Sequence, residues 1–235
     1  MSSLESYVPK SSVSRSVAGG RLLIGLLQGL ALCLIYQAAE NKLWTAGNSG
    51  MFAAFLLVMT LVPVFLISAF GHFPARILLR WLLPAVAVLA LLGFYDIWRG
   101  VGAPYWDTQK FADDARFPSP QLWLNTAAGF FIAHTMVGAA VLEGRRIAGY
   151  RSYFESATKL LIQFAFAAVF TGIIWLVLLL GAALFDMIKL SFLRDVLDES
   201  WFVIPVTTFA FAYALHITDV RPAIVHGIRG LVLVL

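Results

Sequence analysis

The sequence predicts an all-α protein, built as a polytopic bundle of six transmembrane helices. Six long apolar segments contain no Asp, Glu, Lys or Arg. About 20 uncharged residues in a helix are enough to cross the roughly 30 Å hydrocarbon core of a membrane. A soluble chain of this size would instead carry charges on the outer faces of most of its helices. The predicted spans cover residues 22–39, 51–71, 81–95, 122–142, 160–185 and 201–218.

The composition indicates the same class. Hydrophobic residues make up 60% of the chain and charged residues 13%, against about 25% charged residues in typical soluble domains. The Lys and Arg residues lie in short loops between the apolar segments, so we interpret the net charge of +4 as a determinant of orientation and of contact with anionic headgroups. We therefore predict membrane lipids as partners, with other membrane proteins or a second copy of the chain as further candidates, and no nucleic acid.

The two ends of the chain differ from the apolar body. Residues 1–20 are polar and serine-rich, and they are predicted to form a flexible cytoplasmic tail ahead of a transmembrane domain over residues 21–235. The final segment, Leu231–Leu235, is wholly apolar and follows Arg229 and Gly230. It is typical of the start of a seventh span, so we interpret the chain as the N-terminal part of a longer protein. The alternative is a short tail that packs back onto the bundle.

The distribution of basic residues predicts the orientation. Most of the 17 Lys and Arg residues lie in the N-terminal tail and in the loops after the second, fourth and sixth spans, while most of the 13 acidic residues lie in the other loops. Cytoplasmic loops carry an excess of Lys and Arg. The sequence therefore predicts a cytoplasmic N-terminus.

Glycines and prolines distinguish the individual spans. The first span carries Gly25-x-x-x-Gly29, a spacing that lets two helices approach closely. Pro63 lies at the centre of the second span and Pro84 near the predicted cytoplasmic end of the third, and each frees a carbonyl and tends to kink its helix. The fourth span is rich in Ala and Gly and is predicted to be a central helix. Pro205 falls in the first turns of the sixth span, where it is tolerated.

The fifth span and two loops carry further signals. A straight helix over residues 160–185 is about 39 Å long, so we expect the fifth span to tilt or to project beyond the hydrocarbon core. The loop over residues 100–121 contains several aromatic residues, which are typical of the headgroup zone. Residues 187–196 alternate apolar and charged side chains, which predicts either an amphipathic helix in the outer interface or an extension of the fifth span.

Polar side chains inside the spans supply the candidate binding site. His134 lies near the middle of the fourth span, and an ionisable side chain at that depth is a functional hypothesis by default. The alternative is a neutral imidazole that hydrogen-bonds to a Gln, a Thr or a freed carbonyl. The predicted substrate-binding set is His134, His216, Asn125 and Gln163, although Asn125 should face roughly away from His134 on the same helix.

Basic residues near the predicted cytoplasmic ends form a second set. We interpret Arg145, Arg146, Arg151 and Arg221 as topology anchors that contact lipid headgroups, or as a specific site for an anionic lipid or a partner. Asp219 is expected to pair with Arg221 or with His216 at the interface, or Arg221 with His216.

Motifs of enzymes and metal sites are absent from the sequence. It contains no H-E-x-x-H, G-x-S-x-G, Walker A or C-x-x-C pattern. No two carboxylates face each other within the spans, which argues against an intramembrane aspartyl protease. Asp107, Asp113 and Asp114 do not follow a calcium-loop spacing. We predict no catalytic residue, no metal site and no cofactor, and we interpret Cys33 as a buried free thiol.

Two stretches carry a resemblance to a known family. They are RLLIGLLQGLALCLIYQAAE, at residues 21–40, and LFDMIKLSFLRDVLDESWFVIPVTTFAFAYALHITDVRPAIVHGIRGL, which includes Trp201-Phe202-x-x-Pro205 and the run from His216 to Pro222. Nearly the whole chain resembles a bacterial inner-membrane family catalogued as domain of unknown function 4153. The resemblance implies an inner-membrane location and further spans beyond this chain, but no activity.

Three functions remain as hypotheses. The first is transport, or the binding of a small molecule or lipid within the bundle around the kinked spans and His134, and a water-filled cavity reaching His134 would favour it. The second is a structural or assembly subunit of a membrane complex, which a tightly packed interior and a large exposed face of small residues would favour. The third is an intramembrane enzyme acting on lipid-linked substrates, which a lipid-facing groove lined by Arg145 or Arg221 and a histidine would favour.

Overall fold

The computed structural model describes residues 15–41, 48–99, 103–104 and 116–220. Within them, six helices are long and apolar enough to cross a membrane, which confirms the predicted fold class. The elements are α1 (Arg15–Glu40), α2 (Ser49–Ala69), α3 (Ala75–Trp98), β1 (Ala103–Pro104), β2 (Arg116–Phe117), α4 (Pro120–Glu143), α5 (Tyr150–Met187), α6 (Phe192–Leu197) and α7 (Ser200–Val220). Of the predicted tail over residues 1–20, residues 15–20 belong to α1 and residues 1–14 lie outside the described residues, as does the predicted start of a seventh span.

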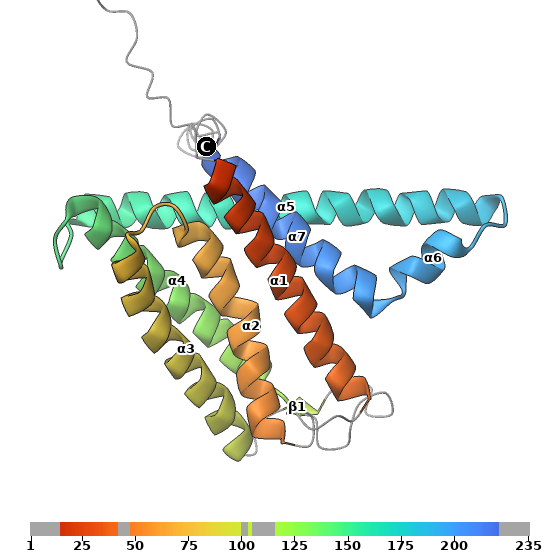
Figure 1. Ribbon diagram of the computed structural model, residues 1–235, viewed down its shortest axis with the longest axis horizontal. Coiled ribbons are helices and arrows are strands. Elements are labelled where there is room, and N and C mark those ends of the chain that lie inside the picture. Colours follow the sequence, from red (N-terminus) through yellow and green to blue (C-terminus); the bar gives the residue numbers. More distant parts are fainter. Residues whose placement is uncertain (1–14, 42–47, 100–102, 105–115, 221–235) are drawn as a thin grey trace, which may run out of the picture.

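The long helices form one bundle whose two ends are chemically different. In Figure 1, α1 to α4 run side by side, α7 lies along α1, and α5 crosses the bundle. The most extensive interfaces join α1 to α7 and α2 to α3. At one end of the bundle α1 and α3 begin and α2, α4 and α7 end. We call it the Asp219 end. The opposite end, where α3 finishes and α4 begins, is the Asp96 end.

Local signals fix the ends of several helices. Asn48 accepts a hydrogen bond from the Met51 amide at 3.2 Å and caps α2. Ser119 caps α4, with proline in the first helical turn, and Gly144 ends α4 at a φ of 64°. Gly71, which we placed in the second span, lies in the turn after α2 with a φ of 89°. The predicted end of that span was therefore two residues too late, because the left-handed backbone of Gly71 ends the helix.

The glycine pair of α1 is the contact surface for α7. A Cβ on Gly25 would collide with the Cβ of Ala212, and one on Gly29 would collide with Thr208 and lie 2.6 Å from the Cα of Pro205. Both positions therefore need glycine for α1 and α7 to approach as closely as they do.

Pro63 opens a hydrogen-bonding position that α1 fills. Since proline has no N–H, the carbonyl of Met59, four residues earlier, lacks its usual partner in the helix. The Gln28 side chain of α1 donates to this carbonyl at 3.2 Å and to that of Thr60 at 3.0 Å. The carbonyl that Pro63 leaves without a partner in α2 is thus hydrogen-bonded by a buried side-chain amide of α1.

The fifth span extends well beyond its predicted limits. α5 has 38 residues, about 57 Å at 1.5 Å per residue, which exceeds the thickness of the hydrocarbon core. Its C-terminal half reaches beyond α1 to α4 in Figure 1. A turn with Lys189 at a φ of 61° separates it from α6, so residues 187–196 form neither one amphipathic helix nor a simple extension. An ion pair of 2.8 Å between Arg194 and Asp186 links α6 back to α5.

The loop before α4 is anchored at the Asp96 end. β1 and β2 pair antiparallel, and the ring of Phe117 packs edge-on against Phe52 of α2, with centroids 5.3 Å apart. Asp96 is buried on α3 and accepts hydrogen bonds from the Ser119 amide at 2.7 Å and the Ser119 hydroxyl at 3.0 Å. A carboxylate that we counted as a loop charge therefore holds the N-terminus of α4 against α3.

Candidate functional site

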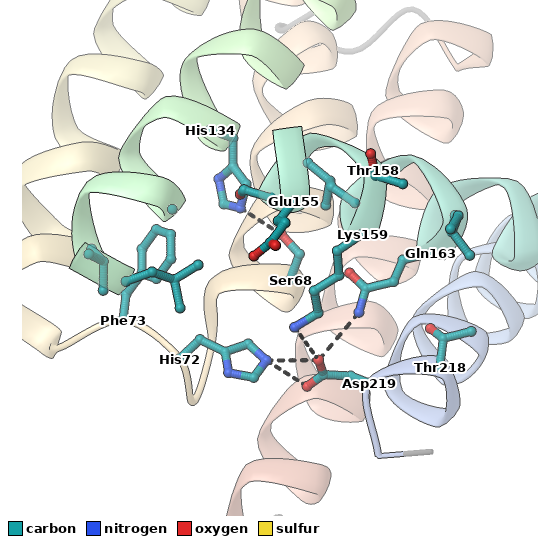
Figure 2. A pocket seen from close by; sticks show the side chains of 16 residues that line it. Ser68, His72, Phe73, His134, Glu155, Thr158, Lys159, Gln163, Thr218 and Asp219 are labelled. Atoms are coloured by element: carbon teal, nitrogen blue, oxygen red, sulfur yellow. Dashed lines mark hydrogen bonds and ion pairs between the residues drawn. The ribbon is translucent and has the colours of Figure 1, made fainter. Parts of the chain in front are cut away.

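A cavity of about 440 Å³ lies at the Asp219 end of the bundle. Figure 2 shows the side chains that surround it. They come from the end of α2 and the following turn, from α4, from the first part of α5 and from the end of α7. The lining residues are Ser68, His72, Phe73, His134, Gly138, Val141, Leu142, Glu155, Ser156, Thr158, Lys159, Leu160, Ile162, Gln163, Thr218 and Asp219.

Asp219 is the centre of a polar cluster at the floor of this cavity. Its side chain is only 4% exposed, and it forms an ion pair of 2.6 Å with Arg21 of α1, whose side chain is 1% exposed. His72 approaches both carboxylate oxygens at 2.7 and 2.8 Å. Lys159 lies 3.1 Å away, and the Gln163 amide donates at 3.3 Å. Asp219 therefore joins α1, α5, α7 and the turn after α2.

The cluster contains more positive than negative charge. A single carboxylate, Asp219, faces the two cations Arg21 and Lys159 and the ionisable ring of His72. Arg21 has a second anchor, since its Nε and Nη2 donate to the Phe70 carbonyl at 3.0 and 2.7 Å. A buried charge is stable in a protein only when it is paired and hydrogen-bonded. Arg21 meets this condition, whereas Lys159 shares its only described carboxylate partner with Arg21 and His72.

His134 forms the opposite wall and is held among aromatic rings. Its Nε2 lies 3.0 Å from the Ser68 hydroxyl, which itself donates to the Phe65 carbonyl at 2.9 Å. With the Ser68 proton directed to that carbonyl the imidazole donates through Nε2, and in the other tautomer Nε2 accepts the proton instead. Its Nδ1 is buried and has no hydrogen-bond partner among the described residues. Phe73 stacks on the ring with centroids 5.4 Å apart.

Within the described residues, Ser68 and His134 do not form a complete catalytic triad. They lie at the distance of a nucleophile and its base, but the Ser68 hydroxyl is also within hydrogen-bond distance of the Phe65 carbonyl, and no described carboxylate orients Nδ1. The described residues contain no group of three or more His, Cys, Asp or Glu side chains that could hold a metal ion. The cavity combines a charged floor with apolar walls, which is a surface for an amphipathic or polar ligand.

Two of the four predicted substrate-binding residues meet in this cavity. His134 and Gln163 both line it. Asn125 is exposed on α4 and His216 lies on α7, and neither is among the lining residues. The predicted divergence of Asn125 from His134 follows from the helical period, whereas sequence alone did not fix which side of α7 carries His216.

The three predicted headgroup-binding arginines that the structure describes lie outside the cavity. Arg145 and Arg146 are exposed in the turn between α4 and α5. Arg151, also exposed, forms an ion pair of 3.0 Å with Glu155, one helical turn later on α5. Arg221 lies outside the described residues. The exposure of Arg145, Arg146 and Arg151 is compatible with headgroup contact.

Sequence reasoning missed the four side chains that form the cluster. Arg21 and Lys159 count in the sequence analysis only among the basic residues that determine orientation, His72 carries no prediction, and Asp219 is predicted to pair with a neighbour in sequence. Its partners within the described chain instead come from segments at least 56 residues away. One signal was present: opposite charges border several apolar spans on the same predicted side of the membrane. That pattern does not specify which spans are neighbours.

Comparisons with models of protein families, with curated proteins and with solved structures found no match to this chain. The resemblance to domain of unknown function 4153 therefore stays a prediction. The function has to be argued from the cavity and its cluster.

Proposed function

We propose that this chain is a multi-pass inner-membrane protein that binds a small molecule or lipid in the cavity at the Asp219 end, in a transport or ligand-carrying role. The observation that carries the proposal is the cavity itself, which reaches His134 and is lined by the buried polar side chains of Gln163, Thr218 and Asp219. Polar and ionisable residues inside membrane spans are expensive, and they mark ligand or ion pathways.

The size and the surface of the cavity support this function. Its volume of about 440 Å³ falls within the roughly 300–1,000 Å³ of known ligand sites. A structural role alone would be served by a closed cluster, because an empty polar cavity loses packing contacts without stabilising the fold. Lys159 and His72, with side chains 48% and 41% exposed, connect the cluster to solvent.

The positive-inside rule supports a cytoplasmic position for the Asp219 end. Arg76, Arg80, Arg145 and Arg146 are exposed around it. We propose that the ligand enters the cavity from the cytoplasm or from the inner leaflet.

Mass spectrometry of compounds that co-purify with the full chain tests the proposed function. We compare the wild type with Thr158→Trp, which places a large ring in the cavity, and with Thr158→Val, which preserves the volume of the side chain. A bound compound should be lost from Thr158→Trp and kept by Thr158→Val. The same compounds at the same occupancy in all three proteins would argue against the cavity as the binding site.

A role as an assembly subunit is the second candidate, and one observation favours it. The C-terminal half of α5 is apolar and extends beyond the bundle, with Leu176, Leu180 and Leu184 more than half exposed. Another transmembrane helix can pack on this surface, and the acyl chains of lipid are the competing occupant. Native mass spectrometry from mild detergent distinguishes them, since a specific partner gives a fixed stoichiometry and lipid does not.

A further inference from the structure

We propose that the cavity at the Asp219 end binds a phosphate group, with Lys159 and His72 as its ligands and Asp219 as the internal counter-ion that the phosphate replaces at these two side chains. The inference rests on the proposed function and names the chemical class of the ligand. The phosphate can belong to a lipid headgroup or to a soluble molecule.

The first argument is the imbalance of charge around the cavity. Arg21 and Lys159 share the carboxylate of Asp219, and His72 bonds the same two oxygens. The other carboxylate of the lining, Glu155, is paired with Arg151 at 3.0 Å. Among the residues that the structure describes, one positive charge of this cluster therefore lacks an anion of its own. An anion in the cavity would balance it.

The second argument is the division of the cluster into a closed and an open side. Arg21 is fully buried, is anchored by the Phe70 carbonyl as well as by Asp219, and is not among the lining residues. Lys159 and His72 do line the cavity, and Figure 2 shows both reaching toward Asp219 from different elements. An incoming anion can therefore engage these two side chains while Arg21 continues to hold Asp219.

The remaining lining explains why the anion would be a phosphate. A tetrahedral phosphate presents several oxygens that can accept from separate donors at once, and lysine binds it as a point charge. Ser156 and Thr158, on the same helix as Lys159, add two hydroxyls to the lining of the cavity. The cavity is also larger than one phosphate requires, and Phe73, Val141 and Leu160 give it apolar walls. A phosphate that carries an apolar group fits both the charged floor and the apolar walls of the cavity.

Two matched pairs of probes test the phosphate itself. Phosphatidic acid and diacylglycerol differ only in that group, and their binding to the full chain in detergent is measured by native mass spectrometry. Inorganic phosphate is titrated by calorimetry against sodium chloride of equal ionic strength. Binding of phosphatidic acid alone identifies a lipid source, and binding of inorganic phosphate as well identifies a site that accepts soluble ligands. Either result supports the proposal.

Three variants of the cluster and one control variant assign that binding to the cluster. Lys159→Gln should weaken binding by roughly 10- to 100-fold, the effect of losing one charge-assisted hydrogen bond, and Lys159→Arg should retain most of it. The matched control is Arg80→Gln, which removes an exposed cation at the same end of the bundle but outside the cavity. His72→Gln is the second test should Lys159→Gln fail to fold.

Asp219→Asn gives a result that a merely structural cluster would not produce. Removal of the internal competitor should tighten phosphate binding in the folded fraction. Weaker binding in a folded Asp219→Asn protein would overturn the counter-ion role, and equal binding of phosphatidic acid and diacylglycerol would overturn the phosphate. If a compound without phosphate co-purifies with the wild type and is lost from Thr158→Trp, the proposed function stands and this inference is wrong. If no compound is lost from Thr158→Trp, both are wrong.

Discussion

Asp96 and Asp219 are both buried carboxylates, at opposite ends of the same bundle, yet their surroundings differ in kind. Asp96 is satisfied by the amide and hydroxyl of one residue, Ser119, only 23 positions along the chain. Asp219 is contacted from three other segments, α1, α5 and the turn after α2, and its ion pair with Arg21 joins residues 198 positions apart. Asp96 joins α3 to the start of α4, while Asp219 joins α1, α5, α7 and the turn after α2 beside a cavity. Burial alone therefore does not distinguish a structural carboxylate from a candidate functional one; the number and charge of its partners do.

The largest effect should follow removal of Asp219. Asp219→Ala leaves Arg21 buried with the Phe70 carbonyl as its one remaining anchor among the described residues, and it removes the carboxylate that Lys159 and His72 contact. Breaking a buried ion pair by removing one partner costs about 3–5 kcal/mol, so we expect a loss of that size in the free energy of unfolding. Equilibrium unfolding in detergent measures it. A loss below about 1 kcal/mol would mean that water compensates Arg21 and that the Asp219 cluster does not hold the helices together.

Removal of Asp96 should cost less and act locally. Asp96→Ala leaves the Ser119 amide without its acceptor, a penalty of about 1–3 kcal/mol for an unsatisfied buried donor. Hydrogen exchange should accelerate in the first turn of α4 and stay unchanged around Arg21. An equal cost for Asp96→Ala and Asp219→Ala, or exchange that accelerates at both ends, would remove the distinction between the two carboxylates.

The same contrast shows how far the sequence can be interpreted. The six spans follow from charge-free segments, because each must match the thickness of the membrane, and the kink signal of Pro63 identified a freed carbonyl that Gln28 proved to satisfy. Helix ends were less predictable. α5 already begins at Tyr150, and its first turns contain polar residues that a hydropathy criterion does not assign to a span. The cluster was not predictable, because pairing of Arg21 with Asp219 depends on α1 and α7 being neighbours, and hydropathy carries no information about neighbours.

His134 was predicted from the sequence as a binding residue, but its contact with Ser68 was not predicted. Its replacement should be tolerated. His134→Leu loses the hydrogen bond to Ser68, but Ser68 keeps its bond to Phe65 and a buried nitrogen without a partner disappears. A replacement of similar volume among aromatic rings should change stability by less than about 1.5 kcal/mol, as measured by thermal unfolding. A larger loss would show that the Ser68 contact stabilises the α2–α4 interface. Unchanged ligand binding in this variant would remove His134 from the mechanism.

The smallest effect should come from the exposed ion pair at the rim of the cavity. Arg151 and Glu155 are one turn apart on α5, with the Arg151 side chain 90% exposed, and such pairs contribute about 0.3–0.5 kcal/mol. Glu155→Gln should therefore shift the unfolding midpoint only slightly, and 1 M salt, with its screening length of about 3 Å, should erase the shift. Glu155→Asp is the matched control, because it keeps the charge while shortening the side chain. The buried pair of Arg21 and Asp219 should resist the same salt. A cost for Glu155→Gln that approaches that of Asp219→Ala, and persists in 1 M salt, would place Glu155 inside the buried cluster instead of at its solvated rim.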